Sequence, residues 1–178
     1  MLTIEDARDA ADLSAVSDLC RQYRRLLLEH DPDMRPTMAH LYPEAAYGAM
    51  LAALPGEHDI LLLARLDGTA VGCAMAHPLP DGSCEAKRVF VSDAARGRGV
   101  ARALMTALIA RARELGYGVL RLDTATTLVA AQRLYESLGF ARRGPYAPVP
   151  PIAEGRLCFF ELALGARADQ LPVPPVSL

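Results

Sequence analysis

The sequence lacks an excess of charge of either sign: 19 lysines and arginines against 21 aspartates and glutamates give a formal net charge of −2. That balance argues against electrostatic capture of nucleic acid or of an anionic membrane. The sequence also lacks an apolar run long enough to span a bilayer. Its first residues, MLTIEDARDAAD, are acidic and do not follow the basic-then-apolar order of a signal peptide. These absences predict a cytoplasmic protein with neither a nucleic-acid nor a membrane partner.

Tryptophan is absent and cysteine is scarce. The four cysteines are Cys20, Cys73, Cys84 and Cys158, with no C-x-x-C pair and no histidine at metal-ligand spacing. This scatter predicts buried small hydrophobes and no metal site, with a nucleophilic or redox cysteine as the open alternative. The histidines form neither a Ser/His/Asp arrangement nor an H-E-x-x-H motif.

What is present is the material for one globular domain, because 52% of the 178 residues are hydrophobic. We predict a domain over residues 1–164 and a proline-rich tail over 165–178. Apolar periodicity and turn signals, Asp67-Gly68 among them, divide the domain into elements. We expect helices at 6–29, 43–54, 98–115 and 128–138, and strands at 2–4, 60–64, 70–76, 84–91, 119–122, 140–142 and 157–164. This order predicts an α+β fold with a mixed sheet of about seven strands and about four helices.

The segment between the strand expected at 84–91 and the helix expected at 98–115 carries the strongest motif, Arg96-Gly97-Arg98-Gly99-Val100-Ala101. A helix N-terminus leaves backbone N–H groups unpaired and carries partial positive charge. Glycines let that backbone approach an anion closely, so the segment is typical of a phosphate-binding loop. It is not a G-x-x-x-x-G-K-[ST] loop, and the G-x-G-x-x-G pattern fails because Arg102 stands in place of the last glycine.

The motif matches [Q/R]-x-x-G-x-[G/A], and the chain resembles the GNAT superfamily of N-acetyltransferases through it. A second segment, Ala131-Gln132-Arg133-Leu134-Tyr135-Glu136-Ser137-Leu138-Gly139-Phe140, resembles that superfamily's helix ending L-Y-x-x-x-G-F. The resemblance implies the acyl-CoA N-acyltransferase fold, with a mostly antiparallel sheet that splays between its fourth and fifth strands. It also implies acetyl-CoA as cosubstrate, with its pantetheine arm held in that splay.

The resemblance assigns the cofactor contacts residue by residue. The backbone of the strand expected at 84–91, the fourth of the sheet, is expected to pair with the pantetheine arm. The amides of residues 97–102 are expected to hold the pyrophosphate. The candidates are Val89, Phe90, Val91, Arg96, Gly97, Arg98, Gly99, Val100, Ala101 and Arg102. Tyr135 matches the tyrosine that lies near the CoA sulfur, where a phenol can protonate or hydrogen-bond the leaving thiolate. Leu128 replaces an asparagine that contacts the cofactor in many members.

The general base and the acceptor contacts are less directly indicated. Amine acetylation needs a group that removes a proton from the ammonium, and Glu85 is the first candidate, followed by Asp123 at the end of its strand. The alternative for Glu85 is a solvent-facing strand glutamate paired with Lys87 or Arg121, and the alternative for Asp123 is a turn residue at the end of its strand. Acceptor-side candidates are Tyr42, Tyr47, Lys87, Arg143 and Tyr146. Lys87 and Arg88 are further considered as readers of a carboxylate on the acceptor, against the alternative of solvated charges.

The sequence therefore predicts an acetyl-CoA-dependent N-acetyltransferase that moves acetyl to a primary amine in a ternary complex. The acceptor is expected to be a small-molecule or peptide amine, and the protein to be a monomer or a homodimer. The alternative is a regulatory protein of the same fold that binds acyl-CoA without turnover. The sequence names neither the acceptor amine nor the length of the acyl group.

Overall fold

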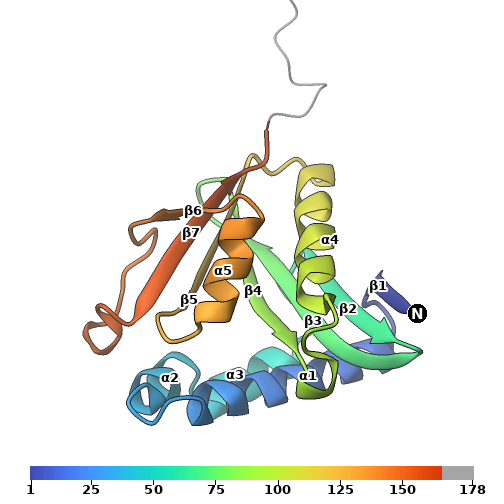
Figure 1. The fold of residues 1–178 in the computed structure, drawn as a ribbon, viewed down its shortest axis with the longest axis horizontal. Helices are drawn as coiled ribbons and strands as arrows, with labels where there is room; N and C mark the ends of the chain where they lie inside the picture. Colours follow the sequence, from blue (N-terminus) through green and yellow to red (C-terminus); the bar gives the residue numbers. More distant parts are fainter. Residues whose placement is uncertain (166–178) are drawn as a thin grey trace, which may run out of the picture.

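The structure, a computed structural model, describes residues 1–165. Its helices and strands follow one another along the chain as β1 (Leu2–Asp6), α1 (Ala10–Glu29), α2 (Arg35–Leu41), α3 (Glu44–Ala52), β2 (Ile60–Leu66), β3 (Thr69–Pro78), β4 (Cys84–Val91), α4 (Val100–Glu114), β5 (Val119–Ala125), α5 (Val129–Ser137), β6 (Ala141–Arg143) and β7 (Leu157–Ala163). The seven strands form one mixed sheet in the order β1-β2-β3-β4-β5-β7-β6 (Figure 1). The predicted fold class is confirmed.

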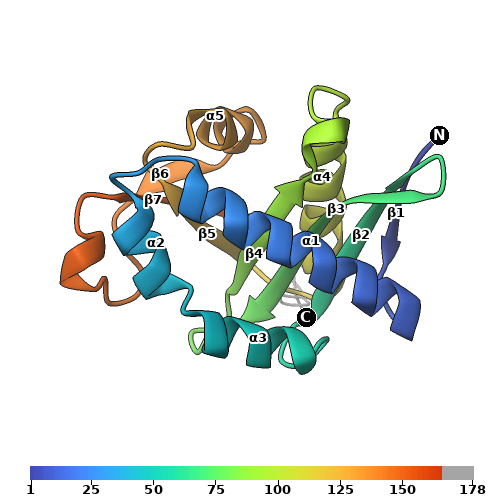
Figure 2. The same cartoon turned by 90° about the horizontal axis from the view of Figure 1, so that it is seen from below.

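Helices cover both faces of this sheet, because side chains along the central strands alternate between two cores. In β2, Leu62 packs in the cluster that contains Leu104 of α4, whereas its neighbour Leu63 packs in the cluster that contains Val16 of α1. Figure 2 shows α1 and α3 apart from α4 and α5, with the central strands between them. Because both faces are buried, the central strands hold the residues at their ends in fixed positions.

The sheet opens between β4 and β5, the one parallel pair. Their ladder contains only Cys84 opposite Leu120 and Glu85 opposite Arg121. Beyond Glu85 the strands diverge, so residues 86–91 of β4 have no partner on β5. β5 instead pairs along its whole length with β7. The predicted splay is therefore present, and it leaves a stretch of backbone with unused hydrogen-bonding groups.

Two local features differ from the sequence-based prediction. A further helix, α2, follows α1, although the prolines were expected only to end the first helix. Pro36 lies in the first turn of α2, where the N–H that proline lacks has no helical partner to lose. The helix expected at 98–115 begins at Val100, because Gly97 and Gly99 take positive φ angles of 73° and 76° and form the preceding loop.

The proline-rich tail predicted over residues 165–178 lies, apart from Gly165, outside the described residues, so the boundary at residue 164 stays a prediction. Within residues 1–165, no helix combines the length and the hydrophobicity that crossing a membrane requires.

Candidate active site

A cleft of about 520 Å³ lies where α1, β4, α5 and the start of α4 meet. Its volume falls within the range of about 300–1,000 Å³ usual for ligand sites. The lining residues are Tyr23, Leu26, His30, Val89, Phe90, Val91, Arg96, Gly97, Ala101, Thr127, Leu128, Val129, Ala130, Ala131, Leu134 and Tyr135. Six of the ten predicted cofactor contacts are among them. The cleft includes the β4 stretch that has no strand partner on β5.

The start of α4 lies at one end of this cleft, where the predicted phosphate-binding loop precedes it. Gly99 is the N-cap residue and has no side chain to cap the first-turn N–H groups, which therefore stay free for a ligand. A Cβ at Gly97 or Gly99 would meet no atom within 4 Å, so their positive φ angles, rather than crowding, favour glycine. Arg96 forms an ion pair with Asp93 at 2.8 Å beside the loop. This arrangement suits a pyrophosphate.

The remaining predicted cofactor residues do not line the cleft. Val100 is buried in the core against the sheet, and Arg98 is exposed. The Arg102 guanidinium donates a hydrogen bond to the Ser137 hydroxyl at 2.7 Å, which ties α4 to the end of α5. Their predicted roles in phosphate binding stay predictions.

Tyr135 of α5 lies at the inner end of the cleft. Its ring is buried against Phe140 and Phe160, with ring centroids 5.9 and 5.8 Å away. Its hydroxyl forms no hydrogen bond with the described residues, and burial raises the pKa of this phenol above its usual value. Tyr135 is therefore a protonated donor at neutral pH, held by packing and available to a ligand.

A second pocket, of about 260 Å³, lies on the α2–α3 side of the splay. It is lined by Leu41, Tyr42, Pro43, Ala46, Tyr47, Met50, Lys87, Arg88, Asp123 and Leu157. Three of the predicted acceptor contacts, Tyr42, Tyr47 and Lys87, line it, and we call it the acceptor pocket after that prediction. A small space of about 20 Å³ between β4 and β5 is lined by Val89 and Tyr135, which also line the cleft, and by Lys87 and Asp123, which also line this pocket. The splay therefore lies between the cleft and this pocket, and we call its narrow gap the passage.

Charged side chains cluster at this passage. The Lys87 ammonium contacts the Asp123 carboxylate at 2.6 Å and the Glu85 carboxylate at 2.8 Å. Burial lowers the pKa of Lys87, but the two carboxylates outweigh that effect and raise it above its usual value. The Tyr146 hydroxyl donates a hydrogen bond of 2.5 Å to Glu85, and His77 lies 3.2 Å from the same carboxylate.

Glu85, the first candidate for the base, lies behind Lys87 and lines neither the cleft nor the acceptor pocket. Burial raises the pKa of Glu85, but the hydrogen bond with His77 and the charge of Lys87 outweigh burial and bring the pKa down to about 2. Its carboxylate is therefore ionised at neutral pH and is a weak base. Asp123, the second candidate, lines the acceptor pocket directly. The sequence pattern does not distinguish the two, because their roles depend on which side of Lys87 each one lies.

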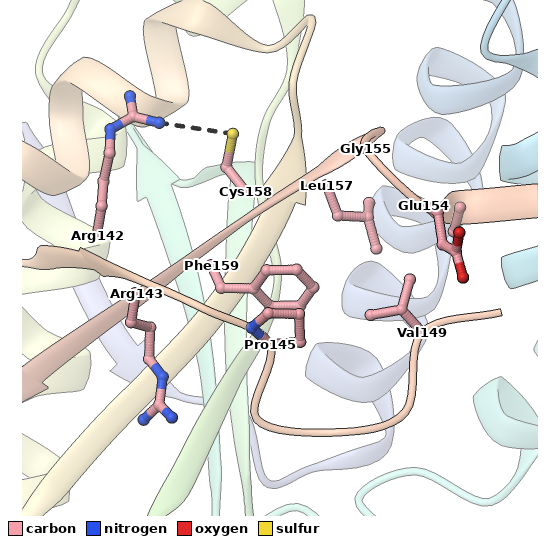
Figure 3. Close-up of a pocket in the computed structure, with 10 residues that line it drawn as sticks. Arg142, Arg143, Pro145, Val149, Glu154, Gly155, Leu157, Cys158 and Phe159 are labelled. Carbon is pink, nitrogen blue, oxygen red and sulfur yellow. Dashed lines mark hydrogen bonds between the residues drawn. The ribbon is translucent and has the colours of Figure 1, made fainter. Parts of the chain in front are cut away.

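The loop after β6 positions the last two acceptor-side candidates away from the acceptor pocket. Tyr146 contacts Glu85 instead, and its ring lies edge-on to Phe159 at 5.6 Å. Arg143 forms an ion pair with Glu161 and lines a separate pocket of about 400 Å³ between the loop and β7 (Figure 3). Neither residue lines the acceptor pocket, so their predicted acceptor contacts stay predictions.

Several residues of the cleft were not predicted from the sequence, among them Tyr23 of α1 and His30 directly after it. Tyr23 lies at the passage, with its ring 5.9 Å from that of Phe90. His30, at the end of α1, places its imidazole Nε2 3.4 Å from the backbone oxygen of Thr127 and closes the outer side of the cleft. The helical spacing of α1 identified Tyr23 as an inward-facing residue, but no local signal indicated that α1 crosses the open end of the splay.

The splayed mixed sheet, with a glycine-led helix start beside the opening, defines a protein of the acyl-CoA N-acyltransferase fold. The family model for the acetyltransferase (GNAT) family matches residues 18–140. The chain therefore belongs to the GNAT family, as the sequence motifs predicted.

Two relatives and one solved structure illustrate the similarity. An uncharacterized N-acetyltransferase of Schizosaccharomyces pombe is 41% identical over 104 residues, which are 56% of this chain and 64% of that protein. An IAA acetyltransferase of Azospirillum brasilense is 36% identical over 116 residues, 64% of this chain and 76% of that protein. A Salmonella typhimurium structure, solved with its cofactor acetyl-CoA, has a TM-score of 0.63 at 24% identity and covers 99% of each chain, which shows a shared fold.

The match spans less than two thirds of the Schizosaccharomyces pombe protein's own length.

Residues 1–165 contain no group of three or more histidine, cysteine, aspartate or glutamate side chains arranged to hold a metal ion.

Proposed function

We propose that the protein is an acetyl-CoA-dependent N-acetyltransferase that moves acetyl to a primary amine by direct attack in a ternary complex. The observation that carries the proposal is that the cleft and the acceptor pocket both border the passage between β4 and β5, which is lined by Tyr135, Lys87 and Asp123. Two substrates bound on opposite sides of this opening bring their reacting groups together without crossing the sheet.

The cleft fits acetyl-CoA, which supplies the acetyl thioester. Amides at the start of α4 suit the pyrophosphate, and the free backbone of Val89 to Val91 suits the amide-rich pantetheine arm. The same β4 backbone N–H groups lie where they can stabilise negative charge on the thioester oxygen as the amine attacks. Leu128 lines the cleft, so a side-chain hydrogen bond at that position is replaced by an apolar contact.

The amine must lose a proton before it attacks, because a typical alkyl ammonium has a pKa of about 10.4. We assign the first proton transfer to Asp123, whose carboxylate lines the acceptor pocket. Glu85, the base predicted from sequence, is the second candidate. Direct transfer to its carboxylate, whose pKa is about 2, runs uphill by roughly eight pKa units. Tyr135 then donates a proton or a hydrogen bond to the departing thiolate.

The test combines acetyl-CoA binding by calorimetry with thiol release in the presence of a panel of primary amines. Binding together with amine-dependent thiol release and an acetylated product detected by mass spectrometry supports the enzyme. Binding without thiol release from any amine supports the alternative, a regulator that senses acyl-CoA. Failure to bind acetyl-CoA refutes both functions.

Variants separate the roles of the side chains. Asp123→Asn is expected to lower kcat/KM about 100-fold at pH 7 and to recover as the pH approaches the pKa of the amine, because solvent then removes the proton. Glu85→Gln is expected to have the smaller effect. If Glu85→Gln instead shows the larger loss and the same recovery, Glu85 is the base. Asp81→Asn, on the exposed turn before β4, is the matched control.

Tyr135→Phe is expected to lower kcat by about 100-fold, the low end for a general acid because a thiolate is already a fair leaving group. Acetyl-CoA affinity should change little, since the buried ring remains. Tyr117→Phe is the control: its hydroxyl bonds Asp59 and lies outside both pockets. An unchanged kcat in Tyr135→Phe removes the phenol from the mechanism.

A further inference from the structure

Arg88 is a charged side chain of the acceptor pocket that has no ionic partner among residues 1–165. Its guanidinium lies 5.5 Å from the centroid of the Tyr47 ring, and one of its terminal nitrogens lies 3.7 Å from the Met75 sulfur. Its Nε is buried and makes no hydrogen bond. A sulfur atom and an aromatic face replace little of the hydration that a guanidinium loses on burial, so such a charge is normally paired.

The neighbouring Lys87 has the opposite status. It forms ion pairs with both Glu85 and Asp123, and these two carboxylates satisfy its charge. Within the described part of the chain, no carboxylate oxygen lies within 4.0 Å of the Arg88 guanidinium. The pocket therefore contains one satisfied cation and one unsatisfied cation.

A bulge in β4 aims Arg88 into the pocket. Successive residues of a regular strand point to opposite faces, yet Lys87 and Arg88 both line this pocket. In the ladder with β3, Cys73 pairs with Phe90 and Met75 pairs with Lys87, so two residues of β4 stand opposite one of β3. Arg88 takes a φ of 54° at this bulge, a left-handed conformation that is rare for residues other than glycine. The strained backbone brings the unpaired guanidinium to the acceptor side.

We propose that Arg88 binds a carboxylate on the acceptor, so that the substrate class is a small amino acid rather than a simple amine. This inference rests on the proposed function. Asp123 faces the substrate ammonium, and Arg88 faces the carboxylate at the bulged end of the same pocket. A guanidinium binds a carboxylate through two parallel hydrogen bonds, and among the described residues neither terminal nitrogen of Arg88 donates to an oxygen atom.

Pocket size and lining narrow the class further. The volume of about 260 Å³ lies below the range of about 300–1,000 Å³ that holds drug-sized ligands. Apart from the charged groups, the walls are apolar or aromatic, including Leu41, Ala46, Met50 and Leu157. A free amino acid with an apolar side chain fits both features.

The experiment compares kcat/KM for matched acceptors: leucine, leucinamide and isoamylamine, then phenylalanine, phenylalaninamide and phenethylamine. The native protein is expected to favour each amino acid over its amide by about 10- to 100-fold, the worth of hydrogen bonds to a charged group. Arg88→Met, which keeps an unbranched apolar stem, should reduce this ratio to near one. Arg88→Lys should restore part of it, because the charge returns without the two-pronged geometry.

Arg113→Met is the matched control, since Arg113 bonds the Leu164 carbonyl oxygen away from the pocket and should leave the ratio unchanged. Amines and amides acetylated as fast as the amino acids overturn this inference and leave the proposed function standing. An unchanged ratio of amino acid to amide in Arg88→Met also overturns this inference and leaves the proposed function standing.

If no amine releases thiol, the proposed function fails, and calorimetry with leucine and leucinamide in the presence of CoA decides the inference separately. Leucine binding that weakens in Arg88→Met, with circular dichroism confirming that the variant is folded, supports the carboxylate site. Equal binding of leucine and its amide to the native protein overturns it.

Discussion

The close approach of β3 and β4 at Gly72 makes a prediction that links packing to the candidate active site. A Cβ added to this buried glycine would lie 2.8 Å from the backbone oxygen of Phe90, 3.1 Å from Leu104 Cδ1 and 3.3 Å from Val91 Cγ2. The nearest atom belongs to the backbone and cannot rotate away. Gly72→Ala therefore has to push β4 outward at the residues that line the cofactor cleft.

The expected cost follows from overpacking, which destabilises cores by about 1–3 kcal/mol. For a domain of this size, 1 kcal/mol shifts the Tm by about 2–4 °C, so Gly72→Ala should lower the Tm by about 2–12 °C. Displacement of Phe90 and Val91 should also weaken acetyl-CoA binding. Differential scanning calorimetry measures the first effect and titration with acetyl-CoA the second.

The control is Gly48→Ala, in α3. Its added Cβ would meet no atom within 4 Å, and its φ is not in the left-handed region. Replacing a helical glycine by alanine should stabilise the protein by about 0.5–1 kcal/mol. A Gly72→Ala protein that melts within 1 °C of the native protein would show that the two strands separate without cost, and would refute the reasoning.

Two further predictions concern the site itself. Because the pKa of Glu85 is lowered from 4.5 to about 2, its contribution to stability is fully present above pH 4.5 and is lost as the pH falls toward 2. That contribution is about 3 kcal/mol. Glu85→Gln should remove this part of the acid limb of the free energy of unfolding, and an unaltered acid limb contradicts the ion-pair network around Lys87. In Gly99→Ala the loop should relax from the left-handed φ in the free protein, and acetyl-CoA must restore that φ at a cost of about 1–2 kcal/mol, so the Kd of acetyl-CoA should rise about 5- to 30-fold. Gly155→Ala introduces the same strain at a φ of 70° with no atom within 4 Å, so it should lower stability but spare affinity; equal affinity losses in both variants would argue against a specific anion site.

The sequence by itself determined the features that depend on neighbouring residues. Apolar alternation and helical spacing predicted the strands and all but one of the helices, and Asp67-Gly68 predicted the turn of the β2–β3 hairpin, where both residues take positive φ angles. The loop before α4 was predictable for the same reason: Gly97 and Gly99 adopt conformations that glycine favours, whatever the rest of the chain does. The GNAT resemblance added the splay, because its two motifs flank it.

Only the tertiary structure decided which charges meet. Glu85 receives its hydrogen bond from Tyr146, 61 residues along the chain, and shares Lys87 with Asp123 on the neighbouring strand. Arg88 points to the same pocket as Lys87 because a bulge breaks the two-residue alternation, which no local pattern of side chains records. Ionisation and burial depend on groups brought together through space, so the sequence indicated a bound CoA, whereas the fold was needed to propose which amine it acetylates.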